Sequence, residues 1–218
     1  MNLVDPYARI WDVSTKEAGV SLLRHVEWIG RISHRSEDAQ TDTSWERFIK
    51  AVVLTHGDWS ITEHANVTVD VLVDRGITHE WVRHRIGAYT QESTRFVNYK
   101  KNLGAKYIKP QNLDEQTELC WHTAIWEADS QYNAMILGGS SPQIARSVLP
   151  NSLASRLIVT YNLRNWRHFF LMRTSIEAHP QMRQVTIPLL KEFQEKIPLL
   201  YSDIVPESRQ IDNLRKAR

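Results

Sequence analysis

The segment Asn66-Val67-Thr68-Val69-Asp70-Val71-Leu72-Val73 gives the clearest secondary-structure signal in the chain. It alternates at a period of two and is rich in β-branched valine, a pattern typical of a β-strand. Gly76 and Thr78 interrupt the pattern, and a short helix is expected to follow at residues 79–85. This part of the chain therefore combines a strand and a helix.

The segments before this strand also combine both types of structure. Residues 3–13 are rich in aromatic and aliphatic side chains and are expected to form a strand. Ser14-Thr15-Lys16-Glu17 has the form of a capping box, which predicts a helix that begins there and ends near residue 33. Hydrophobic residues at helical spacing predict a second helix at residues 44–56.

The segments after this strand are mostly helical in pattern. The expected elements are a strand at 94–99, a helix at 115–137 that ends at Gly138-Gly139, a short helix opened by Ser141-Pro142, an extended segment at 152–160, and helices at 165–173 and 181–195. No repeat or linker interrupts the chain. We therefore expect one α+β domain over residues 1–218, with a central, mostly antiparallel sheet flanked by helices and a frayed tail at 206–218.

The composition is that of a globular protein without a strong overall charge. The chain has 218 residues, 42% of them hydrophobic, and 27 Lys and Arg residues nearly balance 25 Asp and Glu residues, for a net charge of +2. Neither nucleic acid nor a membrane is therefore expected as a partner. The single Cys120 excludes a disulfide framework, and no apolar run approaches about 18 residues. A soluble cytoplasmic protein is expected, or one in the host cytoplasm if the gene is viral.

The densest cluster of chemical groups is Glu80-Trp81-Val82-Arg83-His84-Arg85, which is followed after seven residues by Ser93 and then by Arg95. The planar guanidinium of arginine matches a phosphate or a carboxylate, and His84 adds a titratable donor. On a helix these side chains would point in directions about 100° apart, which suits a helix end that contacts several ligands. A phosphorylated nucleotide is one expected ligand, and a solvated basic turn without a ligand is the alternative.

This cluster resembles the signature of the flavin-dependent thymidylate synthases, in which Arg-His-Arg is followed after seven residues by Ser. Three further segments resemble motifs of the same family, in the family's order. They are His56-Gly57-Asp58-Trp59-Ser60-Ile61-Thr62-Glu63-His64, Ala145-Arg146-Ser147-Val148-Leu149-Pro150 and Tyr161-Asn162-Leu163-Arg164-Asn165-Trp166-Arg167-His168-Phe169-Phe170-Leu171-Met172-Arg173. The resemblance extends over about residues 55–185.

The resemblance implies which side chains bind each ligand. Those implied for the flavin are Ser60, Glu63, Arg83, His84, Arg85, Gln91, Asn162, Arg164 and His168. Those implied for the substrate dUMP are Glu80, Trp81, Val82, Arg83, Gln91, Glu92, Ser93, Thr94, Arg95, Arg146 and Arg173. Arg173 would lie against the uracil ring, where a fixed cation stabilises the negative charge that develops as the ring is activated. It is the expected catalytic residue.

The resemblance also implies the reaction and its partners. dUMP is reductively methylated to dTMP, methylenetetrahydrofolate donates the carbon, and FAD reduced by NADPH donates the hydride. A homotetramer is expected, with active sites shared between chains. Cys120 lacks the Pro-Cys-His setting of the cysteine-dependent thymidylate synthases, so no covalent nucleophile is expected. The nine histidines lack the spacing of a zinc site, so no metal is expected either.

Other interpretations of these residues stay open. The same scaffold could hydroxymethylate the pyrimidine, or the chain could be a non-enzymatic protein that binds nucleotides or RNA. Taken singly, Ser93 could be a loop residue or a helix cap, and His168 could be a core histidine. Arg146 and Arg173 could be surface partners of acidic side chains.

The sequence departs from the family pattern at a few positions. Some members have Gln at the position of Glu80 and Glu at the position of Gln91, so an acid and an amide are exchanged. Asp58 stands where some members have His, and the spacing between Arg173 and His179 is longer than in others. The roles of Asp58 and His179 therefore stay open.

Overall fold

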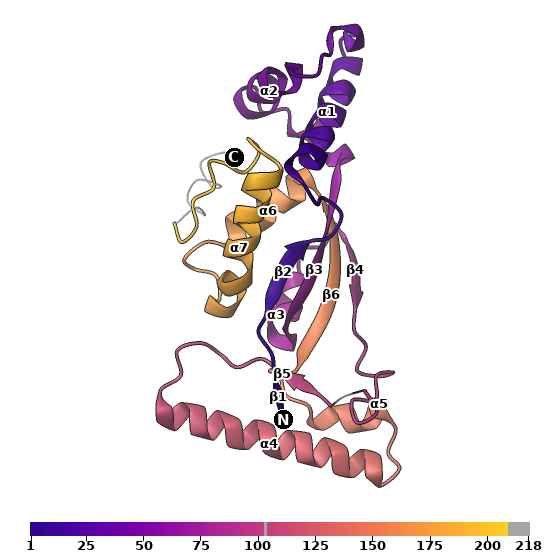
Figure 1. Cartoon of the computed structure of the whole chain (residues 1–218), viewed down its shortest axis with the longest axis vertical. Helices are drawn as coiled ribbons and strands as arrows, with labels where there is room; N and C mark the ends of the chain where they lie inside the picture. Colours follow the sequence, from indigo (N-terminus) through magenta and orange to yellow (C-terminus); the bar gives the residue numbers. More distant parts are fainter. Residues whose placement is uncertain (103, 209–218) are drawn as a thin grey trace. The chain divides into compact units, whose positions relative to one another are not determined.

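The computed structural model describes residues 1–102 and 104–208 (Figure 1). In chain order the elements are β1 (Asn2–Leu3), β2 (Tyr7–Ile10), α1 (Lys16–Ile32), η1 (Glu37–Ala39), α2 (Ser44–Phe48), η2 (Ile49–Thr55), η3 (Trp59–His64), β3 (Asn66–Asp74), α3 (Arg75–Trp81), β4 (Ala88–Gln91), β5 (Lys106–Tyr107), α4 (Glu115–Leu137), α5 (Pro142–Ala145), η4 (Arg146–Val148), β6 (Ala154–Asn162), α6 (Leu163–Arg173) and α7 (Pro180–Lys196). Of the expected frayed tail, residues 209–218 lie outside the described residues. Among the described helices, none combines the length and the apolar character that a membrane span requires.

Four strands form one sheet, in the order β2-β3-β6-β4 (Figure 1). The pairing of β3 with β6 is antiparallel: the Arg75 backbone N–H donates to the Leu153 carbonyl at 3.1 Å, whereas at the other ends of these strands the Thr68 and Thr160 hydroxyls lie 3.0 Å apart. A separate pair of short strands, β1 and β5, is parallel. Helices flank the four-stranded sheet, so the predicted α+β fold with a mostly antiparallel central sheet is confirmed.

By its internal contacts the chain forms two compact units. Unit 1 consists of Met1–Tyr7, Val71–Arg83 and Tyr89–Ile158, and unit 2 consists of Ala8–Asp70, His84–Ala88 and Val159–Arg218. The boundary separates Arg83 from His84, so the Arg-His-Arg cluster contributes side chains to both units. That the whole chain is one domain stays a prediction.

The core of unit 1 is built around three tyrosines, Tyr99, Tyr107 and Tyr132, none of which is more than 6% exposed. The Tyr99 backbone N–H donates to the Tyr132 hydroxyl at 3.2 Å, and the Tyr107 hydroxyl donates to the Asp129 carboxylate at 2.9 Å. These bonds matter because a buried phenol without a partner would cost free energy. Since Asp129 and Tyr132 belong to α4, this long helix closes the core of unit 1.

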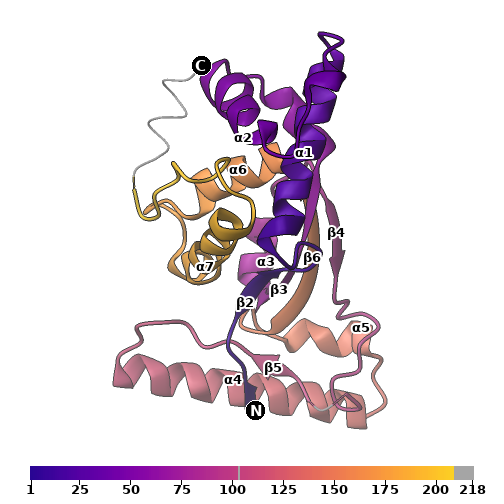
Figure 2. The same cartoon turned by 45° about the horizontal axis from the view of Figure 1, so that its top comes forward.

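The core of unit 2 is aromatic and lies where α6 packs on α7, two helices that run side by side in both views (Figures 1 and 2). The rings of Trp166, Phe170 and Phe193 pack with centroids 4.9 to 5.7 Å apart. The Trp166 indole N–H donates to the Val67 carbonyl at 2.9 Å. This bond fixes α6 to β3, the strand that the sequence shows most clearly.

The Arg-His-Arg cluster does not lie on a helix, and this part of the prediction is wrong. α3 begins at Arg75 because Asp74 caps it: the Asp74 carboxylate accepts the Ile77 N–H at 2.9 Å. The helix then ends at Trp81, before the cluster is reached. The three side chains therefore come from a turn and an irregular segment. The directions about 100° apart that were expected for a helix do not apply.

The prediction of a strand at residues 94–99 is also wrong. The Ser93 carbonyl accepts the backbone N–H groups of Phe96 at 3.2 Å and Val97 at 3.0 Å, which closes a turn. The strand in this region is β4, which precedes Ser93. A residue whose backbone bonds are used within a turn cannot extend a sheet ladder.

The other expected elements agree with the structure more closely. Residues 3–13 form two strands rather than one, and Pro6 between them has no N–H to donate to a sheet. The helix expected at 44–56 changes from α to π geometry at Ile49. The remaining expected helices and the extended segment at 152–160 are confirmed by α1, α4, α5, α6, α7 and β6.

α1 packs on α7 through Gly19. A Cβ atom at this position would lie 1.7 Å from the Lys196 carbonyl oxygen and 3.2 Å from the Ile197 side chain. Contacts this short are not tolerated in a close-packed interior, so the hydrogen of glycine sets how closely the two helices approach.

We expect Gly19→Ala to destabilise unit 2. Overpacking of this kind costs about 1–3 kcal/mol, which exceeds the roughly 1 kcal/mol that alanine gains over glycine in helix propensity. Gly138→Ala is the matched control, because the atom nearest its Cβ lies 3.4 Å away and its φ is −73°. Urea unfolding followed by circular dichroism should show a lower midpoint for Gly19→Ala; equal midpoints in the two variants would contradict the packing argument.

Candidate functional site

The segment His84–Ala88, called the site loop here, lies along one face of α6 in unit 2. The Asn165 amide donates to the Ile86 carbonyl at 2.8 Å, the Phe169 ring lies 5.0 Å from the His84 ring, and the Arg173 Nε–H donates to His84 Nε2 at 2.9 Å. These three residues recur at every fourth position and so share one face of the helix. One face of α6 therefore contacts the site loop at both His84 and Ile86.

The site loop also approaches β6 closely. A Cβ atom on Gly87 would lie 2.2 Å from the Tyr161 ring, so only glycine lets the backbone reach this position. The Tyr161 ring in turn lies 6.4 Å from the His84 ring at a tilt of 43°. The loop is therefore held from both the strand and the helix.

The His84 ring is neutral at physiological pH. Burial lowers the pKa of His84 to about 4, and the neighbouring Arg173 and His168 lower it in the same direction. Because Nε2 accepts the Arg173 hydrogen bond, the single ring proton is assigned to Nδ1. The sequence predicted a titratable donor at this position, whereas the structure has a neutral ring that accepts at Nε2.

Several residues implied for the flavin lie on η3, β6 and α6 in unit 2. Arg164 donates to the Glu63 carboxylate at 2.6 Å, and both side chains are about half exposed. Asn162 caps α6, because its side-chain oxygen accepts the Asn165 N–H at 2.8 Å. Ser60 and His168 are exposed, as is Arg85 of the site loop. An exposed His168 does not fit the alternative of a core histidine.

Four of the residues implied for dUMP, Ser93, Thr94, Arg95 and Arg146, lie in unit 1. Arg146, at the start of η4, donates to the Thr94 hydroxyl at 3.1 Å, so this arginine contacts the turn that follows Ser93. The Ser93 hydroxyl accepts the Arg95 backbone N–H at 3.3 Å. Arg95 itself is exposed, with its guanidinium 5.4 Å from the Phe96 ring centre. The turn thus carries Ser93, Thr94 and Arg95, and Arg146 contacts it through Thr94.

The amide of Gln91 has a fixed orientation. Its Nε2 donates to the Thr78 hydroxyl and to the Ser155 hydroxyl, both at 3.0 Å, while the Thr78 hydroxyl donates to the Arg75 carbonyl at 2.9 Å. Thr78 has already committed its proton, so a carboxylate at position 91 would place two acceptors against each other. This network gives a physical reason for an amide where some family members have an acid.

Glu92 lies next to the tyrosine core of unit 1. Its carboxylate accepts the Tyr99 hydroxyl at 2.8 Å. Burial raises the pKa of Tyr99, and the neighbouring Glu92 charge raises it further, so the phenol stays protonated and remains a donor. Of the remaining substrate candidates, Trp81 is fully buried, Glu80 and Val82 are partly buried, and Arg83 is exposed.

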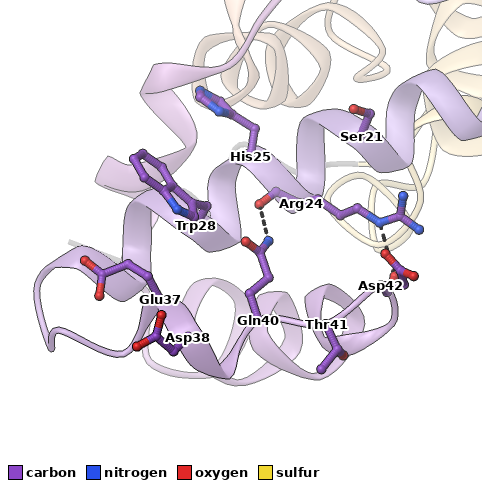
Figure 3. A pocket seen from close by; sticks show the side chains of 9 residues that line it. All are labelled: Ser21, Arg24, His25, Trp28, Glu37, Asp38, Gln40, Thr41 and Asp42. Carbon is purple, nitrogen blue, oxygen red and sulfur yellow. Dashed lines mark hydrogen bonds between the residues drawn. The ribbon is translucent and has the colours of Figure 1, made fainter.

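The described residues also line two surface hollows, and most of these residues have no predicted site role. The first, of about 560 Å³ in unit 2, is lined by α1 and by the segment around η1 (Figure 3). In it the Gln40 amide donates to the Arg24 carbonyl at 2.7 Å, and the Arg24 Nε–H donates to the Asp42 carbonyl at 3.1 Å. The second, of about 590 Å³ in unit 1, is lined in part by Glu92. Glu92 is the one residue with a predicted site role among the described linings of these two hollows.

Sequence reasoning missed the residues that hold the site residues in place. Asn165, Phe169 and Tyr161 fix the site loop, and Thr78 with Ser155 orients Gln91. The four-residue spacing that links Asn165 and Phe169 to Arg173 is visible in the sequence and could have indicated a shared face. No comparable signal points to Thr78 or Ser155, because their meeting with Gln91 depends on the pairing of distant strands.

Known proteins share this sequence pattern. The model of the family described as thymidylate synthase complementing protein matches residues 20–199. The flavin-dependent thymidylate synthase of Corynebacterium glutamicum is 31% identical over 218 residues, which span 89% of this chain and 84% of the relative. That of Corynebacterium efficiens is 29% identical over 93% of this chain and 86% of the relative. That of Pyrococcus abyssi is 33% identical over 66% of this chain and 61% of the relative.

The fold is also similar to that of a solved structure. The crystal structure of a UMP/dUMP methylase from Streptomyces cacaoi, bound with 5-Br dUMP, gives a TM-score of 0.77 at 23% identity and covers 92% of this chain and 95% of that chain. This likeness supports the fold, and the family follows from the matched sequence. The chain belongs to the thymidylate synthase complementing protein family, together with the flavin-dependent thymidylate synthases that it resembles.

Proposed function

We propose that this chain is a methyltransferase, a flavin-dependent thymidylate synthase that converts dUMP to dTMP. Methylenetetrahydrofolate would donate the carbon, and NADPH would reduce the bound FAD. The observation that carries the proposal is the half-buried Arg173 at the end of α6, whose Nε is held by the neutral His84 ring. A cation held in place before the reaction is what stabilisation of a developing negative charge requires.

Arg173 would act on the uracil ring. As the ring is activated to attack the one-carbon unit, negative charge develops at N3 and O2, and a guanidinium can stabilise it with directed hydrogen bonds. Partial burial strengthens this effect, since charges interact more strongly where water is partly excluded. Arg173 needs no proton transfer for this role, because arginine stays protonated.

Arg146 and Arg95, with the hydroxyls of Ser93 and Thr94, would bind the nucleotide phosphate. Guanidinium groups form paired hydrogen bonds with phosphate oxygens, and hydroxyl groups can add single ones. The bond between Arg146 and Thr94 supports this assignment, since it orients one guanidinium within the turn. Two exposed cations near one turn also explain how a chain of net charge +2 could bind a dianion through a local site.

The residues present fit a flavin dinucleotide. In unit 2, Arg85 is exposed and carries a cationic group suited to its phosphates, and the exposed pair of Arg164 and Glu63 offers a donor and an acceptor. When reduced and bound, the flavin supplies the hydride that completes the methyl group. The chain's own residues bind and orient the reactants, and no side chain needs to act as a covalent nucleophile.

We expect the purified protein to retain a yellow flavin and to form dTMP from dUMP, methylenetetrahydrofolate and NADPH under anaerobic conditions. The measurement is absorbance in the blue, followed by chromatography of the products with NADPH oxidation recorded in parallel. Formation of 5-hydroxymethyl-dUMP without net NADPH oxidation would replace the proposal by a pyrimidine hydroxymethylase. A colourless protein that neither quenches FAD fluorescence nor forms product, and whose nucleic-acid binding falls steeply with salt, would point to a binding protein instead.

We also propose that the protein is a homotetramer in which sites combine residues of several chains. The supporting feature is an apolar stripe on α4, formed by Leu119, Trp126 and Leu137, which are 62%, 60% and 71% exposed. The three positions are separated by whole numbers of turns, so they lie on one face of the helix. Large apolar side chains exposed along one face are typical of a surface that a second copy covers.

A charge on this stripe should disrupt the assembly. Trp126→Glu would bury a carboxylate against apolar groups of the second copy, so a lower molecular mass is expected in size-exclusion chromatography with light scattering. Ala124→Glu is the matched control: it adds the same charge to an exposed position on another face of the same helix. A monomeric wild-type protein would reject the homotetramer, and a mass unchanged by Trp126→Glu would exclude this face as the interface.

A further inference from the structure

We propose that His84 is a positioning residue for Arg173: as a neutral acceptor it fixes the Nε of the guanidinium and so sets the direction of its terminal nitrogens. This inference rests on the proposed function, in which Arg173 stabilises charge on the uracil ring. It adds a role to the flavin contact implied for His84 by the sequence.

Arg173 is fixed at both ends. Its backbone carbonyl accepts the hydroxyl of Thr186, which is fully buried on α7, at 2.8 Å. Its Nε donates to His84 Nε2 at 2.9 Å. A guanidinium is planar, so a bond that fixes Nε also fixes the plane in which the two terminal nitrogens lie.

The His84 ring is itself packed among three other rings. The Phe169 ring contacts it edge-on at 5.0 Å, the Tyr161 ring lies at 6.4 Å, and the His168 ring lies at 6.0 Å. The following loop is anchored by Asn165 at the Ile86 carbonyl. A ring held on several sides can orient a flexible arginine at little cost in side-chain entropy.

The neutral form of His84 is a requirement of this arrangement. A protonated ring would have no acceptor at Nε2 and would place a second positive charge beside the Arg173 guanidinium. Two basic groups of α6, Arg173 and His168, lie beside the ring and both lower its pKa, and the Tyr161 ring of β6 lies on another side. Burial and these neighbours together keep the acceptor available at physiological pH.

The decisive experiment is a double-mutant cycle in kcat at saturating FAD. His84→Leu removes the acceptor, and a guanidinium misplaced by about 1 Å should lower kcat by about 100-fold, with KM for dUMP changed little. His84→Gln offers an amide oxygen to the Arg173 Nε–H and should restore kcat to within about 10-fold of the wild type. The Arg173→Ala variant is itself expected to be nearly inactive. In that background His84→Leu should lower kcat by less than about 2-fold, because its effect acts through Arg173.

Other outcomes of the cycle would overturn the inference. If His84→Leu lowers kcat by the same factor with and without Arg173, His84 acts independently of Arg173, for example through the flavin alone. If His84→Gln is as inactive as His84→Leu, an acceptor at this position is not what matters. His25→Gln, which replaces an exposed histidine of α1, controls for loss of a histidine as such.

A readout without turnover separates this inference from the proposed function. In protein labelled with ¹⁵N-arginine, the Arg173 Nε–H signal should be protected from exchange in the wild type and in His84→Gln, and unprotected in His84→Leu. A protected signal in a protein that forms no dTMP would reject the proposed function and keep the hydrogen bond. Rapid exchange in an active wild-type protein would reject the positioning role and keep the function.

The same contact predicts an unusual titration. The His84 ring should become protonated near pH 4, whereas an ordinary histidine does so near pH 6.5. Because the folded-state pKa is depressed, the stability that His84 contributes is present in full above about pH 6.5 and is lost as the pH falls through about 4. Ring ¹⁵N shifts measure this titration. Arg173→Ala should raise the pKa, and a wild-type midpoint near 6.5 would contradict the assignment.

Discussion

The Arg173 Nε–H can donate to His84 Nε2 only while that nitrogen carries no proton. This constraint explains why the ring is half-buried among Phe169, Tyr161 and His168, in surroundings that disfavour an imidazolium. The backbone that follows His84 runs close to β6, and only glycine at position 87 allows this approach. The direction of the arginine thus depends on the protonation state of His84 and on the path of the loop that carries it.

α6 holds Arg173 in position for this hydrogen bond because two of its faces make different contacts. Trp166 and Phe170 pack into the aromatic core with Phe193, which anchors the helix. The face with Asn165 and Arg173 holds the site loop instead. The Asn162 cap fixes where the helix starts, and the rise and rotation per residue then place Arg173 three turns further on. A displacement of the core face would therefore be transmitted to the guanidinium.

The sequence predicted what local patterns determine and missed what distant contacts determine. Alternation identified β3, and spacing identified α1, α4, α6 and α7, because both depend on neighbouring residues. The helix expected at 79–85 was misplaced, since the cap at Asp74 started it earlier than the hydrophobic pattern suggested. Motif resemblance selected Arg173 and His84 but assigned them to different ligands. Their contact joins residues 89 positions apart in sequence, which no local pattern encodes.

The Arg-His-Arg cluster is therefore not three equivalent cationic groups. Arg83 and Arg85 are exposed, whereas His84 between them is partly buried and neutral. A third cation at the middle position would lie against Arg173 and would pay the cost of burying like charges, unless a ligand anion were always present. A histidine avoids this cost because it can lose its proton and still present an acceptor. The order of residue types in the motif thus follows from electrostatics: two exposed cations remain available to anions, and the neutral ring between them orients the arginine of α6.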